Sequence, residues 1–124
     1  MAEIRRASRV AERMREELAL LLRGLSDPRL EGVVVTRVEV ADDLGHARIF
    51  VRREMVTPDP KLQKRVLAGF EAATPRLRRD LTKVLALRVA PVLKFLYDEG
   101  VEAQERVAEL LREIADEKAK REGG

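Results

Sequence analysis

Two short segments with the composition of β-strands, separated by a polar loop, constrain the fold of this chain more than any other feature. Residues 33–40 (VVVTRVEV) and 46–53 (HARIFVRR) are rich in β-branched side chains, and the five residues between them suit a hairpin loop. Apolar and charged side chains alternate along the second segment, which predicts a sheet with one buried and one charged face. Residues 92–97 (VLKFLY) predict a third strand.

Segments with the periodicity of amphipathic helices lie on both sides of this hairpin. The first is predicted to end near Gly24, because residues before a proline such as Pro28 avoid helical angles. A second pattern begins near Lys61 and is interrupted at Ala73-Thr74-Pro75, since proline lacks an N–H and its ring clashes with the preceding turn. A new helix is predicted after this break, and a last amphipathic helix after the third strand. The predicted order is α-β-β-α-α-β with an extra C-terminal helix.

The length of 124 residues predicts a single α+β domain over residues 1–117, followed by a flexible tail at 118–124. The chain has no cysteine, which excludes disulfides, zinc–thiolate sites and cysteine nucleophiles. It also has no apolar run of about 18 residues. We therefore expect a cytoplasmic protein that does not associate with membranes.

Positive charge is concentrated in the middle of the chain. Between Lys61 and Lys94 there are nine Lys or Arg residues and only two acids, whereas residues 1–60 are balanced and residues 95–124 are acidic. An ordinary solvated helix can be basic, but this excess is not offset by nearby acids. Charge gathered on one element is typical of proteins that bind polyanions. A nucleic acid is thus the favoured ligand, although charge alone does not select which one.

No group of residues has the spacing of a catalytic, metal or nucleotide site. His46 is the only histidine and begins a predicted strand, where a solvated or hydrogen-bonded role is usual. Asp42 and Asp43 suit a turn better than a metal pair. The glycines form neither G-x-G-x-x-G nor a Walker loop. We expect no catalysis, no cofactor and no metal.

The few aromatic residues could in principle stack on nucleic-acid bases. Phe95 and Tyr97 lie in an apolar strand, which favours core packing. Phe50 is the exception, because it shares a strand face with Arg48 and Arg52.

Three stretches of the sequence resemble one known family, bacterial ribosome-binding factor A. They are RVAERMREELALLL at residues 9–22, DPRLEGVVVTRVEVADDLGHARIFV at 27–51 and LRVAPVLKFLYDEGVEAQERVAELL at 87–111. No single motif is diagnostic, but the combination, in the right order over most of residues 9–111, is specific.

This resemblance implies a type II KH-like fold, in which a three-stranded sheet has its helices packed on one face. It implies a non-catalytic late assembly factor that binds the small (30S) ribosomal subunit and its 16S rRNA. Such a factor assists processing of the 5′ end of the rRNA precursor, supports growth in the cold and leaves before translation. We expect a monomer that is not a stable part of translating ribosomes.

The resemblance also directs attention to the helix interruption, where the family has an Ala-x-Gly kink. Here the matching residues are Ala73, Thr74 and Pro75, so proline replaces a glycine that could adopt positive φ. Contact with phosphates is therefore expected mainly from side chains. The candidate RNA-binding residues are Arg9, Arg13, Lys64, Arg65, Arg76, Arg78, Arg79, Lys83 and Arg88.

An alternative of a different class is a protein-interaction module that uses the first and last amphipathic helices. The apolar stripe of the first helix is compatible with it, but the stripe is short for a coiled coil. That alternative predicts association that is independent of RNA and insensitive to salt.

Overall fold

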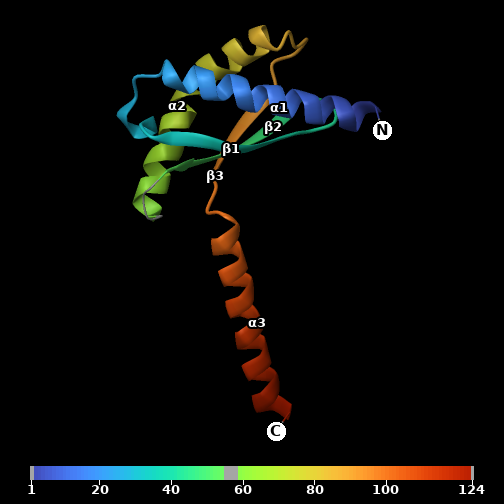
Figure 1. Ribbon diagram of the computed structural model, residues 1–124, viewed down its shortest axis with the longest axis vertical. Helices are drawn as coiled ribbons and strands as arrows, with labels where there is room; N and C mark the ends of the chain where they lie inside the picture. The colour runs from blue at the N-terminus through green and yellow to red at the C-terminus, as the bar shows by residue number, and fades with distance from the viewer. Residues whose placement is uncertain (1, 55–58, 124) are drawn as a thin grey trace.

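The computed structural model describes residues 2–54 and 59–123, with the backbone alone described at 2–4, 101–107, 109, 122 and 123. Within these residues the elements follow the order α1-η1-β1-β2-α2-β3-α3 (Figure 1). The three strands are confirmed at their predicted bounds, and the first helix ends one residue before Gly24. The elements are α1 Ala2–Arg23, the 3-10 turn η1 Pro28–Leu30, β1 Val33–Val40, β2 His46–Arg53, α2 Pro60–Val84, β3 Val92–Tyr97 and α3 Val101–Gly123.

The strands form a mixed sheet in the order β1-β2-β3, in which β2 is antiparallel to β1 and parallel to β3. The register of β1 against β2 shifts between Val35 and Arg37, so Thr36 forms a bulge. Strict alternation would have placed Arg37 on the same face as Val33 and Val35. Because of the bulge, Val38 faces the core instead, and the charged residues of β1 share the opposite face.

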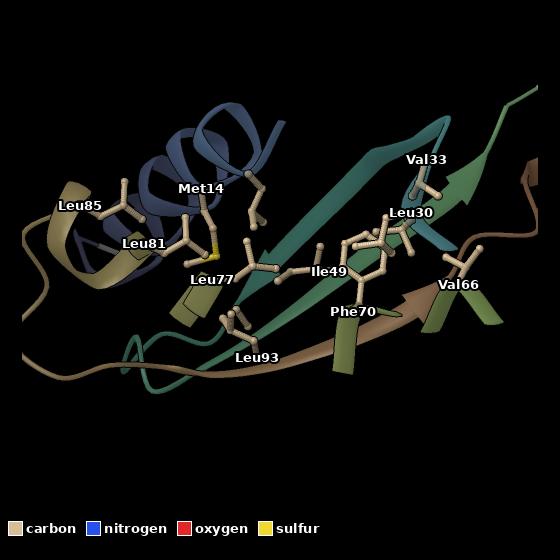
Figure 2. Close-up of a cluster of buried hydrophobic side chains, with 13 residues drawn as sticks. Met14, Leu30, Val33, Ile49, Val66, Phe70, Leu77, Leu81, Leu85 and Leu93 are labelled. Carbon is tan, nitrogen blue, oxygen red and sulfur yellow. The ribbon is translucent and has the colours of Figure 1, made fainter. Parts of the chain in front are cut away.

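The hydrophobic core lies between the sheet and the two helices α1 and α2, which cover one of its faces (Figure 2). This arrangement confirms the predicted α+β fold with helices on one face. The ring of Phe70 on α2 stacks on Phe95 of β3 with centroids 4.5 Å apart, which ties the helix to the edge strand. Side chains with 0% exposure are Met14, Leu18, Ile49, Val51, Val66, Phe70 and Leu81.

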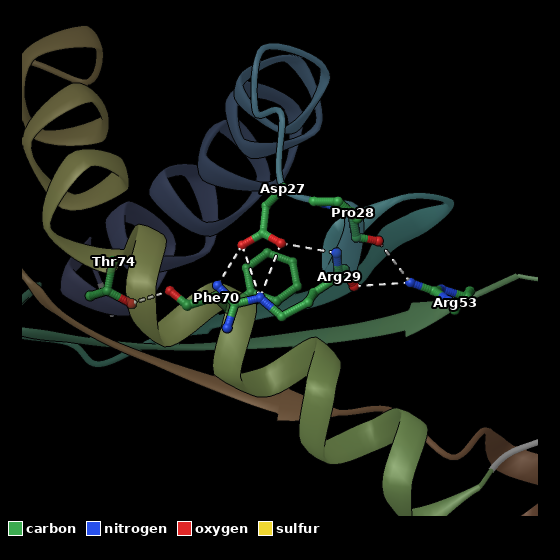
Figure 3. Close-up of polar contacts among 6 residues, drawn as sticks. All are labelled: Asp27, Pro28, Arg29, Arg53, Phe70 and Thr74. Atoms are coloured by element: carbon green, nitrogen blue, oxygen red, sulfur yellow. Dashed lines mark hydrogen bonds and ion pairs between the residues drawn. The ribbon is translucent and has the colours of Figure 1, made fainter.

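A polar cluster shapes η1 and joins it to Arg53 at the end of β2 (Figure 3). The carboxylate of Asp27 caps the turn by accepting from the backbone N–H of Arg29 at 2.9 Å, and it also accepts from the Arg29 guanidinium. These bonds hold the pKa of Asp27 below its usual value. Arg53 donates to the carbonyl oxygen of Arg29 at 3.0 Å. On the facing side of α2, Gly69 allows close packing, since a Cβ there would lie 2.8 Å from a methyl of Leu30.

The predicted interruption at Pro75 is wrong, because α2 is one continuous helix that contains Pro75 in its interior. Proline removes one N–H from the helical ladder but does not end the helix, since both halves bury side chains in the same core. Figure 1 shows α2 bent between these halves. The hydroxyl of Thr74 donates to the carbonyl oxygen of Phe70 at 2.7 Å near the bend (Figure 3).

The C-terminal helix α3 extends away from the sheet (Figure 1). It is joined to β3 by residues 98–100, where Gly100 has a φ of 88°. Every side chain from Leu110 to Arg121 is exposed. The predicted last helix is confirmed, and it continues through residues 118–123, where we expected a tail. The flexibility of this segment and the extent of the domain, 1–117, stay predictions, and residues 1, 55–58 and 124 lie outside the described residues.

Candidate nucleic-acid interface

The second half of α2 and the loop leading to β3 border a shallow, open hollow of about 790 Å³, which we call the basic hollow. Because Leu77 and Leu81 point into the core, the polar side of this half of α2 faces outward. Four cationic side chains and no acidic one line the hollow. Its lining residues are Pro75, Arg78, Arg79, Thr82, Lys83, Ala86, Leu87, Arg88 and Ala90.

Arg78 fixes the two walls of the basic hollow to each other. Its Nε donates to the carbonyl oxygen of Pro91, and its Nη2 donates to that of Ala90, both at 2.8 Å. Charge-assisted bonds of this kind are stronger than neutral ones. The side chain of Arg78 is exposed, as expected, but its two hydrogen bonds also hold the loop before β3 to α2. A substitution at this position would therefore alter the loop before β3 as well as the charge of the hollow.

The end of α2 shapes the floor of the basic hollow. The N–H of Leu87 donates to the carbonyl of Thr82 at 3.0 Å, and that of Ala86 donates to Lys83 at 3.2 Å. This pair of bonds is the Schellman pattern, which needs a left-handed residue after the helix. Ala86 takes that conformation with a φ of 52°. The reversal of the chain here brings Arg88 back toward α2.

An acid on α2 neutralises part of the positive charge beside the basic hollow. The carboxylate of Asp80 lies 3.8 Å from the guanidinium of Arg76 and 3.8 Å from that of Arg79. The arginine side chains are 60% and 75% exposed, so water weakens both ion pairs. Arg79 and Lys83 thus remain available to a ligand with stronger negative charge.

The basic hollow brings together four of the nine predicted RNA-binding residues: Arg78, Arg79, Lys83 and Arg88. Arg76 lies beside it on α2. The other four are exposed but do not line it, with Lys64 and Arg65 on the first half of α2 and Arg9 and Arg13 on α1. Binding of RNA by these residues stays a prediction.

Sequence reasoning missed Arg6. This residue and Arg88 line a second hollow of about 540 Å³, although they are 82 positions apart in the sequence. Arg88 lines both hollows, so it joins them into one surface. Asp42 and Asp43 also line the second hollow and reduce its positive charge. The signal in the sequence was that Arg6 directly follows Arg5, which with Arg9 and Arg13 forms a stripe of arginines at four-residue spacing on α1.

The face of the sheet opposite the helices carries the remaining candidate for base stacking. The guanidinium of Arg37 lies 4.1 Å from the centre of the Phe50 ring and covers it. Core packing of Phe95 and Tyr97 is confirmed, since both pack against the buried cluster. The hydroxyl of Tyr97 also accepts from the backbone N–H of Arg53 at 3.1 Å.

Two residues weighed as candidates for metal binding or catalysis, Asp43 and His46, lie in and just after the loop between β1 and β2. The carboxylate of Asp43 accepts from the N–H of Gly45 at 2.8 Å, which confirms its role as a turn former. His46 is exposed at the start of β2. The described part of the chain contains no group of three His, Cys, Asp or Glu residues able to hold a metal ion. No helix within it is both long and apolar enough to cross a membrane.

A mixed three-stranded sheet with two helices on one face, the second bent and bordered by basic side chains, defines a KH-like domain. The model of the ribosome-binding factor A family matches residues 6–111. A ribosome-binding factor A from Sorangium cellulosum is 53% identical over 113 residues and 91% of each chain. The chain belongs to the ribosome-binding factor A family.

Solved structures of relatives share this fold. A Thermotoga maritima protein assigned to ribosome-binding factor A has a TM-score of 0.66 at 29% identity, covering 78% of this chain and 91% of that one. A homology model of ribosome-binding factor A from Thermus thermophilus, fitted into a cryo-EM map of its complex with the 30S subunit, has a TM-score of 0.56 at 24% identity. That match covers 69% of this chain and 88% of the Thermus chain.

Proposed function

We propose that this protein is a non-catalytic ribosome assembly factor that binds the 30S subunit through its 16S rRNA. The observation that carries this proposal is the basic hollow, which gathers four cations without an acid in its lining. Membership of the ribosome-binding factor A family supports it. So does the Thermus relative, which was fitted into a map of its complex with the 30S subunit.

The basic hollow suits the phosphate backbone of a folded RNA better than the edges of its bases. Arg79, Lys83 and Arg88 offer charge-assisted hydrogen bonds to phosphate oxygens. Contacts of this kind position a protein on RNA without reading its sequence. Specificity then comes from the shape of the folded rRNA, which the bend of α2 and the second hollow would match.

The cellular role we propose is late maturation of the small subunit in the cytoplasm. A protein with no catalytic group changes an assembly pathway only by binding one rRNA conformation more tightly than another. Preference for the immature conformation would assist processing of the 5′ end of the 16S precursor and would matter most in the cold. Release of the monomeric factor follows when maturation reshapes its site, before the subunit enters translation.

Gradient sedimentation of cell lysate at low and moderate salt tests this function. The wild-type protein is expected with free small subunits, absent from translating ribosomes, and lost from subunits as salt rises. The variant Arg79→Glu with Lys83→Glu is expected at the top of the gradient even at low salt. Arg78 is kept, because its bonds to Ala90 and Pro91 belong to the fold.

Lys120→Glu with Arg121→Glu is a matched control, because it makes the same charge change on exposed positions of α3, away from the basic hollow. It should sediment with subunits as the wild type does. Equal binding by wild type and the Arg79/Lys83 variant would show that the basic hollow does not contact the subunit. A wild-type protein that stays at the top under all conditions would contradict the proposed function itself.

The alternative function is a protein-interaction module that docks a partner on the first and last helices. The first of these helices is not available for a partner. The apolar stripe of α1 is occupied, since Ala7, Met14 and Leu18 are buried in the core. Among its described side chains, α3 has an exposed apolar stripe formed by Leu110, Leu111 and Ile114.

A further inference from the structure

The second hollow lies next to the basic hollow and has a different lining. Arg6 of α1, the loop between β1 and β2, and the loop before β3 surround it. Its volume of about 540 Å³ falls in the range of sites that hold small ring systems. Two cations and two acids line it, whereas the basic hollow is lined by cations without an acid. Since acids weaken the attraction of a surface for phosphates, binding of phosphates alone does not account for them.

The two acids of the second hollow have different surroundings. The carboxylate of Asp43 is used by the loop itself, because its Oδ1 accepts from the N–H of Gly45 at 2.8 Å. Asp42 is exposed, and no hydrogen bond or ion pair joins its carboxylate to the residues that the structure describes. An ionised carboxylate only accepts hydrogen bonds, and its two oxygens lie side by side. Asp42 therefore offers two neighbouring acceptors to a ligand.

Apolar side chains and guanidinium groups form the rest of the lining. Leu44, Leu87 and Val89 line the hollow, and Val89 is 72% exposed. Aliphatic side chains that are open to solvent in this way suit the face of an aromatic ring. The guanidinium groups of Arg6 and Arg88 are planar, so they stack on nucleobases and donate paired hydrogen bonds to acceptors on their edges.

Backbone hydrogen bonds hold the walls of the second hollow in place. The N–H of Val92, at the start of β3, donates to the carbonyl of Gly45 at 2.9 Å and joins the two loops. The N–H of Leu44 donates to the carbonyl of Ala41 at 2.8 Å and closes the turn. Leu44 has a left-handed φ of 61°, which a leucine rarely adopts. Backbone strain of this kind concentrates at functional sites.

Guanine is the nucleobase whose edges match both kinds of charged group in this hollow. Its N1–H and its 2-amino group are neighbouring donors that one carboxylate can accept together. Its O6 and N7 are neighbouring acceptors for which arginine is the commonest partner. Adenine and cytosine offer a carboxylate an amino group beside a ring acceptor, and uracil flanks its N–H with two carbonyl oxygens. The other bases therefore satisfy the carboxylate less well.

We propose that the second hollow binds an unpaired guanine of the RNA whose phosphates lie in the basic hollow. Asp42 accepts from the N1–H and 2-amino group, Arg6 and Arg88 contact the O6 and N7 edge or the ring face, and Val89 covers the ring. Because Arg88 lines both hollows, contacts to the base and to the phosphates fall on one continuous surface. This inference rests on the proposed function, since it adds base recognition to an interface whose other contacts are to phosphates.

Fluorescence anisotropy with labelled RNA hairpins that differ in one bulged nucleotide tests this proposal. The wild-type protein should bind a hairpin with a bulged guanine about tenfold more tightly than hairpins with a bulged adenine or uracil. Inosine at the bulge should bind more weakly than guanine, because it lacks the 2-amino group. Equal affinity for all the hairpins, or preference for a base other than guanine, would overturn the proposal and leave the proposed function standing.

Asp42→Asn keeps the shape of the side chain and removes its charge, and the exposed position should leave folding unaffected. We expect this variant to lose its preference for guanine without losing affinity for the uracil hairpin. Asp80→Asn is the matched control, since Asp80 lies beside Arg76 and Arg79 and does not line the second hollow. It should raise the affinity for every hairpin equally and keep the preference for guanine.

The two variants separate base recognition from a simple effect of charge. If Asp42→Asn also raised the affinity for every hairpin equally, Asp42 would only reduce the local charge and the proposal would be wrong. Absence of binding by the wild type to any of the hairpins at low salt would contradict the proposed function itself, and this proposal with it.

Discussion

At the scale of single residues, Thr36 and Asp98 connect three parts of the fold. Thr36 is the bulged residue of β1, and its hydroxyl donates to the carboxylate of Asp98, which follows β3. The other carboxylate oxygen accepts from the N–H of Gly100 at 2.9 Å. The bond from Thr36 is the main reason that the pKa of Asp98 lies below its usual value, and Arg37 and Arg52 act in the same direction.

This depressed pKa makes the stability of the protein depend on pH at the acid end. The stabilisation is complete above about pH 4, the pKa of an unfolded Asp, and is lost as the pH falls through the native pKa of Asp98. Thr36→Val should cost about 1 kcal/mol of unfolding free energy at pH 7, and this difference should shrink toward pH 2. Urea unfolding at both pH values measures it.

Thr74→Val is the control for this measurement, because the hydroxyl of Thr74 bonds a backbone carbonyl that does not titrate in this range. Its cost should be the same at both pH values. A cost of Thr36→Val that stays constant with pH would show that Asp98 is not stabilised by this hydroxyl.

The identity of Arg78 as a structural residue could not be predicted from the sequence. Local periodicity places it correctly among the exposed cations of α2. Its partners, however, are backbone carbonyls of Ala90 and Pro91, and every residue offers a carbonyl. Such a contact depends on how the loop before β3 returns to the helix, which is a tertiary property.

At the scale of elements, the end of α2 holds a strained residue. Ala86 occupies a left-handed position that is usually taken by glycine, because its Cβ crowds the following carbonyl. Ala86→Gly should stabilise the protein by about 0.5–1 kcal/mol, since relief of this strain exceeds the added freedom of the unfolded chain. Thermal unfolding followed by circular dichroism measures the change.

Ala72→Gly, an exposed and helical position within α2, is the matched substitution, and it should destabilise the protein by up to about 1 kcal/mol. Opposite signs for the two changes are the expected result. If Ala86→Gly also lowers the melting temperature, the left-handed conformation of Ala86 is not a source of strain.

The strands were predictable because their β-branched composition and polar boundaries are local signals, as in residues 33–40 and 46–53. Two features depended on packing instead. The bulge at Thr36 follows from the need to bury Val38 on the same face as Val35. Continuity of α2 through Pro75 follows from a shared core beneath both halves, which overrides a local helix-breaking signal.

At the scale of the whole molecule, binding to the subunit should depend steeply on salt. With about five phosphate contacts, the logarithm of the binding constant should fall against the logarithm of salt concentration with a slope on the order of −4. Titration of labelled protein with purified 30S subunits at several KCl concentrations gives this slope. Arg88→Gln should lower its magnitude by about 1. A slope near zero would favour a protein–protein contact.

The excess of positive charge in the middle of the chain was predictable, but which of its cations lie together in the fold was not. Composition alone treats Lys64, Arg78 and Arg88 as equivalent cations. Chain reversal after α2 decides which of them meet, and the same reversal brings Arg6 near Arg88. The acids that neutralise part of this charge, such as Asp80, are likewise recognised only from the distances between their carboxylates and the arginines.

The bonds from Arg78 to Ala90 and Pro91 also have a consequence for the kinetics of binding. Since they join the loop before β3 to α2 in the free protein, both walls of the basic hollow are preorganised. A ligand then finds its partners already placed, and little conformational entropy is lost when it arrives. The rate of association should accordingly be set by diffusion and electrostatic steering rather than by a slow rearrangement of the loop.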